Sequence, residues 1–196
     1  MSVVAARIVR RVIEVSRGPE PTLLEQAGLA AGSDAPVPAP VYYGLLERCA
    51  ANDPTLPLRY GRAVRPEDFG AFGLALKTAR DVGDVLQRLA RYILVVSDTL
   101  VYTLHPDPPQ LVLEGRRAGR RGIELANECA LAAIVSLLRQ VVEGPVVPSR
   151  VDFRHANPEL RGPERQAHEA FFGCPVVFGA ARDGLMLDDR LLATPT

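Results

Sequence analysis

The stretch RHANPELRGPERQAHEAFFGCPVVFGAARDGLMLDDRLLATP (residues 154–195) decides the expected fold, because its hydrophobic period changes several times. Apolar and polar residues alternate over 151–155, as in a strand with one buried face. Pro163 suits the first position of a helix, and Gly173 suits its C-terminal cap. Two short strands follow, and the segment 188–195 begins with two aspartates that can cap a last helical turn and ends near a closing proline. The predicted order is strand, helix, strand, turn, strand, short helix.

This stretch resembles the end of the arabinose-binding-like N-terminal domain of AraC/XylS-type transcription regulators, and within them the ornithine-utilisation regulators. The matching pieces are RHANP, the run FFGCPV followed by Phe178, and the ending L-x-L-D-x-x-x-L-x-x-P. Upstream, LPLRYGRAVRPEDFGAFGLALKTARDVGDVLQRLARY (56–92) resembles the middle section of the same domain. The resemblance spans residues 3–195 and implies a regulatory domain, but it does not identify a ligand.

Composition places the chain among ordinary globular proteins. It has 196 residues, of which 47% are hydrophobic and 23% charged, enough for one large domain or two small ones. No apolar run approaches the ~18 residues of a membrane span. The N-terminal sequence has arginines inside its apolar pattern, unlike a signal peptide, and Cys49, Cys129 and Cys174 are too scattered for a disulfide framework. We therefore expect a cytoplasmic protein with no membrane partner.

The charge balance argues against DNA binding by this part of the chain. Lys plus Arg equals Asp plus Glu at 23 each, so the formal net charge is zero. DNA-binding domains usually carry a basic excess, because neutralised phosphates supply most of their affinity. The family resemblance implies a C-terminal pair of helix-turn-helix units. We expect that DNA-binding domain to be absent from this chain, and DNA to be contacted only through it.

Helical periodicity dominates the first two thirds of the chain. Apolar residues recur every three or four positions in six predicted helices, over 2–16, 22–27, 40–52, 66–79, 81–96 and 123–142. The segment 30–40 is rich in Pro, Ala and Gly and is the one candidate boundary. We expect a single regulatory domain over 1–196, in which residues 1–38 could form a helical arm. Residues 56–62 are predicted to form a short extended or irregular segment.

Two glycines and an arginine-rich segment need separate explanations. Gly70 and Gly73 lie within a predicted helix, where each costs about 1 kcal/mol relative to alanine. Close packing of another backbone is the favoured reason, and a ligand the alternative. The segment GRRAGRRG (115–122) is predicted to be a flexible, solvated loop, with recruitment of an acidic partner as the alternative.

The positions of the predicted strands indicate the fold class. Residues 100–105 and 111–115 read as two strands of an antiparallel hairpin around a proline turn. The strand 150–155 follows a long helix, so a crossover could make one strand pair parallel. We predict an α+β fold with a mixed or antiparallel sheet of about five strands, packed with several helices and preceded by a helical N-terminal part.

No catalytic or metal-binding motif is found in the sequence. His105, His155 and His168 are far apart, and none forms a zinc-ligand pattern with cysteine. His155 is expected to be a hydrogen-bonded histidine at the core edge. Cys174 follows a predicted helix C-terminus, where the dipole disfavours a thiolate, and is expected to be a small buried hydrophobe. We therefore expect no enzyme, no cofactor and no metal.

A ligand pocket can be built from apolar side chains without any motif. Candidates are aromatic residues near glycines or on strand faces, and an arginine able to bind a carboxylate. The ligand-binding residues proposed on this basis are Phe69, Phe72, Arg91, Tyr92, Tyr102 and Phe153. The alternative for each aromatic residue is an ordinary core position, and for Arg91 a surface or ion-pair role.

The sequence favours the effector-sensing and dimerising N-terminal domain of an AraC-family regulator. The resemblance does not identify the small-molecule effector, because the regulators that this chain resembles respond to varied compounds, which include amino acids and lipid-like molecules. The first helix or the helix 123–142 could supply the contact of a homodimer. One alternative is a stand-alone ligand-binding or protein-interaction domain without DNA-binding activity. Another is an enzyme, which would need His155, Cys174 and an acidic residue to converge.

Overall fold

The computed structural model describes residues 2–30, 32–115, 119–156 and 163–196. The chain forms an α+β fold with a two-stranded sheet near the N-terminus and a five-stranded mixed sheet. Its elements are β1 (Val3–Val4), α1 (Ala6–Val15), α2 (Glu20–Gln26), β2 (Val37–Pro38), α3 (Ala39–Ala50), α4 (Leu56–Ala63), the 3-10 helix η1 (Pro66–Phe69), α5 (Ala71–Lys77), α6 (Val82–Tyr92), the 3-10 helix η2 (Ile93–Val95), β3 (Val101–Pro106), β4 (Pro109–Glu114), α7 (Arg121–Val141), β5 (Arg150–Phe153), α8 (Pro163–Phe172), β6 (Val176–Phe178), β7 (Asp183–Met186) and α9 (Asp189–Leu192).

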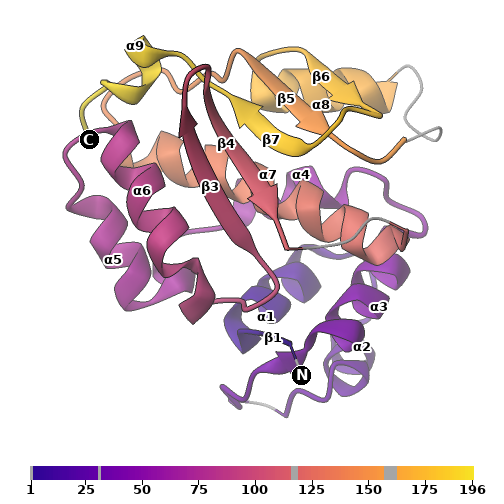
Figure 1. Ribbon diagram of the computed structural model, residues 1–196. Coiled ribbons are helices and arrows are strands. Elements are labelled where there is room, and N and C mark those ends of the chain that lie inside the picture. The colour runs from indigo at the N-terminus through magenta and orange to yellow at the C-terminus, as the bar shows by residue number, and fades with distance from the viewer. Residues whose placement is uncertain (1, 31, 116–118, 157–162) are drawn as a thin grey trace.

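The larger sheet has the strand order β3-β4-β7-β5-β6. The hairpin β3-β4 is antiparallel, as are the pairs β4-β7 and β5-β7, whereas β5 and β6 are parallel. The parallel pair follows from the crossover through α8, which lies behind these strands in Figure 1. The structure thus confirms the predicted fold class and the hairpin; one strand pair is parallel as expected, but the crossover that produces it is α8 and not the long helix α7.

Helix α7 is the centre of the molecule. It runs between the sheet and the N-terminal helices (Figure 1) and packs most closely against α4 and α3. Its side chains are buried around almost its whole circumference, as expected for a helix that is apolar on nearly every face. Gly61 of α4 permits the close approach, because a Cβ there would lie 2.8 Å from the Cβ of Ala132.

The helix α4 corrects the sequence prediction for residues 56–62, which was an extended or irregular segment. Leu56, Leu58 and Tyr60 are all buried in the helical conformation. A segment of eight residues that carries both a proline and a glycine has little helical tendency alone. Packing against α7 therefore supplies the stability that local propensity lacks.

The predicted helix 66–79 is divided into η1 and α5 by Gly70, whose φ of 59° interrupts the helix. The second glycine, Gly73, lies against the carbonyl of Pro66. A Cβ at Gly73 would lie only 1.7 Å from that oxygen. The expectation of close backbone packing at Gly73 is confirmed, and the packing partner is the preceding turn.

Two further segments differ from the sequence predictions. The first helix begins at Ala6 rather than at residue 2, because Val3 and Val4 pair with β2. In the arginine-rich segment, Arg120 binds Glu47 at 2.8 Å and Arg121 binds the buried Glu128 at 3.0 Å. The prediction of a solvated basic loop is therefore wrong for Arg121, which belongs to α7, whereas Arg120 is exposed. Residues 116–118 lie outside the described residues.

A buried carboxylate joins α7 to β5 and α8. Glu128 is 1% exposed, and its two carboxylate oxygens lie 3.1 Å from His155 Nε2 and 3.2 Å from His168 Nε2. Burial alone would raise the pKa of Glu128, but the histidine hydrogen bonds and the charge of Arg121 outweigh it and lower that pKa to about 2. His155 is a hydrogen-bonded core residue, as the sequence predicted.

We predict that Glu128→Gln lowers the free energy of unfolding by about 3 kcal/mol at neutral pH, because it removes one partner of a buried charge cluster. The folded-state pKa of about 2 lies below the ordinary value of 4.5. The carboxylate therefore contributes fully above pH 4.5, and its contribution is lost as the pH falls toward 2. Urea unfolding at several pH values measures both effects, since the variant should lack this part of the acid sensitivity.

The matched control is Glu124→Gln on the same helix. Glu124 is partly exposed and lies 3.5 Å from Arg121, so a change within about 0.5 kcal/mol is expected. Equal losses for the two variants would contradict the special role of Glu128.

Candidate ligand-binding cavity

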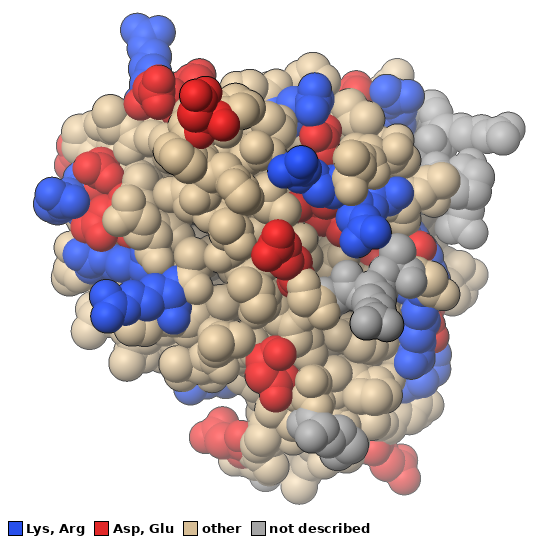
Figure 2. Space-filling model, in the orientation of Figure 1, with Lys and Arg blue, Asp and Glu red and all other residues tan. Residues whose placement is uncertain are grey.

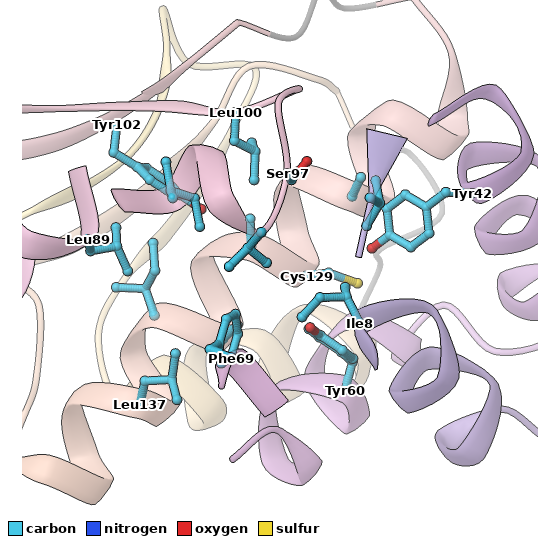
Figure 3. A pocket seen from close by; sticks show the side chains of 17 residues that line it. Ile8, Tyr42, Tyr60, Phe69, Leu89, Ser97, Leu100, Tyr102, Cys129 and Leu137 are labelled. Atoms are coloured by element: carbon cyan, nitrogen blue, oxygen red, sulfur yellow. The ribbon is translucent and has the colours of Figure 1, made fainter. Parts of the chain in front are cut away.

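An apolar cavity lies where the N-terminal helices, α6, α7 and the start of β3 meet (Figure 3). Segments far apart in sequence build its wall, which is lined by Val4, Ile8, Tyr42, Tyr60, Phe69, Leu89, Ile93, Val96, Ser97, Leu100, Tyr102, Ala126, Cys129, Ala130, Ala133, Ile134 and Leu137.

Small side chains of α7 create the space. Ala126 lies three and four residues before Cys129 and Ala130, and Ala133 lies four and three residues after them, so the four share one face of the helix. Protein interiors contain few voids larger than a water molecule, because side chains normally interdigitate. Here the cavity volume is about 50 Å³. Ligand pockets usually measure about 300 Å³ or more, so this cavity must widen before it can take an ordinary small molecule.

The cavity is closed on one side by the N-terminal residues. Val4 and Ile8 line it directly. The amide N–H of Ala5 donates to the carbonyl oxygen of Val96 at 3.0 Å, and that of Val3 donates to Asp98 Oδ1 at 2.7 Å. These hydrogen bonds fasten the first strand to the segment that joins η2 to β3.

The polar groups on the wall are hydroxyls and one thiol. They belong to Tyr42, Tyr60, Ser97, Tyr102 and Cys129. In Figure 3 the Tyr42 hydroxyl and the Cys129 sulfur lie on one side of Ile8, and the Tyr60 hydroxyl lies on the other. Within the described part of the chain, the lining includes no Lys, Arg, His, Asp or Glu. The cavity is thus uncharged, with a few hydrogen-bonding groups in apolar surroundings.

Tyr60 is the buried polar group of most interest. It is 3% exposed, and no hydrogen bond joins its hydroxyl to any residue that the structure describes. Burial, followed by the nearby Tyr42, Cys129 and Asp68, raises its pKa well above the ordinary value of 10. The phenol is therefore protonated at neutral pH and can donate a hydrogen bond.

The residues proposed from sequence occupy three places. Phe69 and Tyr102 line the cavity. Phe72 packs edge-on against Phe69, with ring centroids 6.1 Å apart, but does not line the cavity. Phe153 is fully buried near the other edge of the sheet, against Phe172 and Phe178.

Arg91 and Tyr92 lie on the outside of α6. Both are exposed, and they border a surface groove together with Arg88 and Asp84. The Arg91 guanidinium carbon lies 5.4 Å from the centre of the Tyr92 ring, a cation–π contact. The structure therefore does not bring Arg91 or Tyr92 to the cavity.

Sequence reasoning did not single out Tyr42, Tyr60 or the alanines of α7 as ligand-binding residues. Tyr60 lies in the segment that was predicted to be irregular. The alanines were the one sequence signal that could have indicated a cavity, because small residues repeat on one face of a long apolar helix. The same pattern also permits close helix packing, so it cannot by itself indicate a cavity.

The other candidate groups form structural contacts. Burial raises the pKa of the Cys174 thiol to about 11, as suits a buried hydrophobe. Each of His155 and His168 binds a different oxygen of Glu128. Among the residues described here, no group of three or more His, Cys, Asp and Glu side chains is arranged to hold a metal ion. Likewise, no described helix has both the length and the apolarity needed to cross a bilayer.

Comparison with known proteins gives a family and a fold. Residues 19–196 match the family model described as the arabinose-binding domain of AraC transcription regulator, N-term. The crystal structure of the transcriptional regulator CdpR from Pseudomonas aeruginosa is similar, with a TM-score of 0.60 and 19% sequence identity. The alignment covers 94% of this chain and 56% of that regulator, so the chain spans little more than half of its length. A search of curated proteins finds no match.

We predict that Ala133→Val raises the free energy of unfolding by about 1 kcal/mol, because its two added carbons fill part of the cavity. Chemical denaturation measures the change. The control is Ala132→Val, whose Cβ faces α4 at Gly61 and which should lose about 1–3 kcal/mol through overpacking. Equal destabilisation by both variants would show that the space beside Ala133 is filled in solution.

Proposed function

The chain belongs to the family of the arabinose-binding N-terminal domain of AraC transcription regulators, and from this premise we propose that it senses a small-molecule effector and dimerises within such a regulator. The observation that carries the proposal is the buried apolar cavity between α7 and the N-terminal helices. Ligand sites are commonly concave and mostly apolar, with a few polar groups that set orientation. This cavity has that composition.

The small size of the cavity suggests how binding could be transmitted. An effector that needs a larger cavity than this one of about 50 Å³ must separate elements that touch in the closed form. Such a ligand binds the widened arrangement better than the closed one, and it therefore shifts the equilibrium between them. We propose that this shift, carried by α1, η2 and α7, repositions a DNA-binding part of the regulator.

We propose that a separate helix-turn-helix part of the regulator reads DNA. The chain has 23 basic and 23 acidic residues, and on the face shown in Figure 2 the two kinds are interspersed. A surface of this kind gives weak attraction for phosphates. We propose that the domain acts in the cytoplasm, where the regulator meets DNA, and that it performs no catalytic step.

We propose that the dimer contact lies at η2 and the start of β3. The apolar face of α7 is used within the protein, whereas Leu94, Val95 and Val101 are exposed. Val95 is 79% exposed and Leu94 59% exposed, and β3 is an edge strand of the sheet. Exposed apolar groups beside an open strand edge are typical of interaction surfaces.

We expect thermal unfolding against a panel of metabolites to identify an effector. A ligand at one hundred times its dissociation constant should add about 2.7 kcal/mol of stability, which raises the unfolding midpoint. The Ala133→Val variant serves as the control, because its partly filled cavity should reduce the shift. A shift that is unchanged in this variant would place the binding site elsewhere, and no shift with any compound would count against the sensing function.

The dimer contact predicts that Val95→Asp weakens self-association at least tenfold, since it buries a charge in an apolar interface. Sedimentation equilibrium measures the change. Val177→Asp is the matched control, because Val177 is 38% exposed on β6, at the opposite edge of the sheet. A monomeric wild type, or a dimer insensitive to Val95→Asp, would overturn this placement.

A further inference from the structure

The Tyr60 hydroxyl is a hydrogen-bond donor held inside the cavity. Figure 3 shows its oxygen directed toward the space between Phe69, Ile8 and Cys129. Tyr60 is 3% exposed, and its hydroxyl makes no hydrogen bond to the residues that the structure describes. A buried polar group without a partner is unfavourable, so a ligand that supplies an acceptor recovers free energy on binding.

The helix that carries Tyr60 fixes the position of this donor. The backbone carbonyl of Tyr60 accepts a hydrogen bond from the amide of Val64 at 3.0 Å. The next residue, Gly61, lies against Ala132 and the ring of Phe171 so closely that a Cβ there would be 2.8 Å from each. With α4 held on α7, the phenol cannot readily turn out to solvent.

The charges around the cavity disfavour an ionised ligand. The described residues that line it carry neither a cation nor a carboxylate. A ligand carboxylate would thus be buried without a counter-charge in the wall, which is unfavourable. A ligand ammonium group would equally lack an acidic partner in the wall.

Arg11, a cation near this end of the cavity, is already paired. Arg11 donates to Asp68 through Nε at 3.0 Å and through a terminal nitrogen at 2.8 Å, and it also binds Glu14 at 2.6 Å. Arg11 does not line the cavity. Its charge is therefore offset before it could serve a ligand anion.

A polyhydroxylated ligand fits the wall no better. Each hydroxyl group of a sugar needs a hydrogen-bond partner when it leaves water, and its burial in apolar surroundings is otherwise costly. Twelve of the seventeen lining residues have only hydrocarbon side chains, and the five others carry one hydroxyl or thiol each. The wall therefore favours a ligand with few polar atoms.

We infer that the effector is a small uncharged molecule with an apolar body and one acceptor oxygen, such as a ketone, ester or alcohol, which accepts a hydrogen bond from Tyr60. This inference rests on the proposed sensing function and names the ligand class of the same cavity. Tyr60 then sets specificity for the polar group, while the α7 face opposite it limits the size of the apolar body.

The test uses matched probes that differ only in their polar group. They are 2-alkanones and 1-alkanols of four to eight carbons, the carboxylates and alkylammonium ions of the same lengths, and L-arabinose. Isothermal titration of the whole chain with each probe gives the dissociation constants. The ketones and alcohols should bind at least tenfold more tightly than the ions of equal length, and L-arabinose should not bind measurably.

Two tyrosine variants separate the hydrogen bond from general packing. Tyr60→Phe keeps the ring and removes the hydroxyl, so it should weaken ketone binding about tenfold while leaving the fold intact by circular dichroism. Tyr43→Phe is the control, because Tyr43 is also buried but does not line the cavity. Its ketone affinity should equal that of the wild type. Unchanged ketone affinity in Tyr60→Phe would overturn the assigned role of Tyr60.

The remaining outcomes distinguish this inference from the sensing function. Binding of a carboxylate or of L-arabinose that Ala133→Val abolishes would overturn the uncharged ligand class and leave the sensing function in place. Failure of all neutral probes, together with a cavity ligand found in the metabolite panel, would do the same. Failure of the probes and of the whole panel would overturn both.

Discussion

Helix α7 must be covered on nearly every side, and the rest of the structure depends on that requirement. Its 21 residues are mostly apolar, so the sheet packs against one flank and α3 and α4 against another. The one buried acid on the helix, Glu128, is acceptable only because Arg121, His155 and His168 surround it. These contacts fix β5 and α8 against the helix, which means that the same helix positions both the N-terminal part and the end of the chain.

The cavity arises from this arrangement. A face of small residues allows another helix to approach closely, as Ala132 does at Gly61. On the neighbouring face, Ala126, Ala130 and Ala133 meet aromatic and branched side chains that cannot fill the space completely. A void so near the central helix gives a ligand a direct means of moving several elements at once. In the proposed function, this is the physical basis for coupling between binding and the arrangement of the domain.

Family and ligand chemistry are separate properties of this protein. The family match and the similarity to CdpR concern the fold, and at 19% identity the two chains share few side chains. Ligand selection depends instead on the groups that line the cavity of this chain. An uncharged wall with the Tyr60 donor is chemically different from a sugar site, although the family description names arabinose. The structure therefore argues for testing neutral apolar compounds alongside sugars and amino acids.

The sequence by itself determined the elements whose signals are local. Asp81 and Asp188 cap their helices as their spacing indicated, the hairpin follows its alternating pattern, and the long apolar helix was evident. Tertiary structure decided the features that depend on distant partners. Residues 56–63 are helical because α7 covers them, and Arg120 is paired because the fold brings Glu47 of α3 beside it. Phe69 and Tyr102 were proposed from sequence and line the cavity, but Tyr60 was not. The cavity results from the packing of α1, α4 and α7 against one another, and no periodic pattern in the sequence of any one of these helices indicates it.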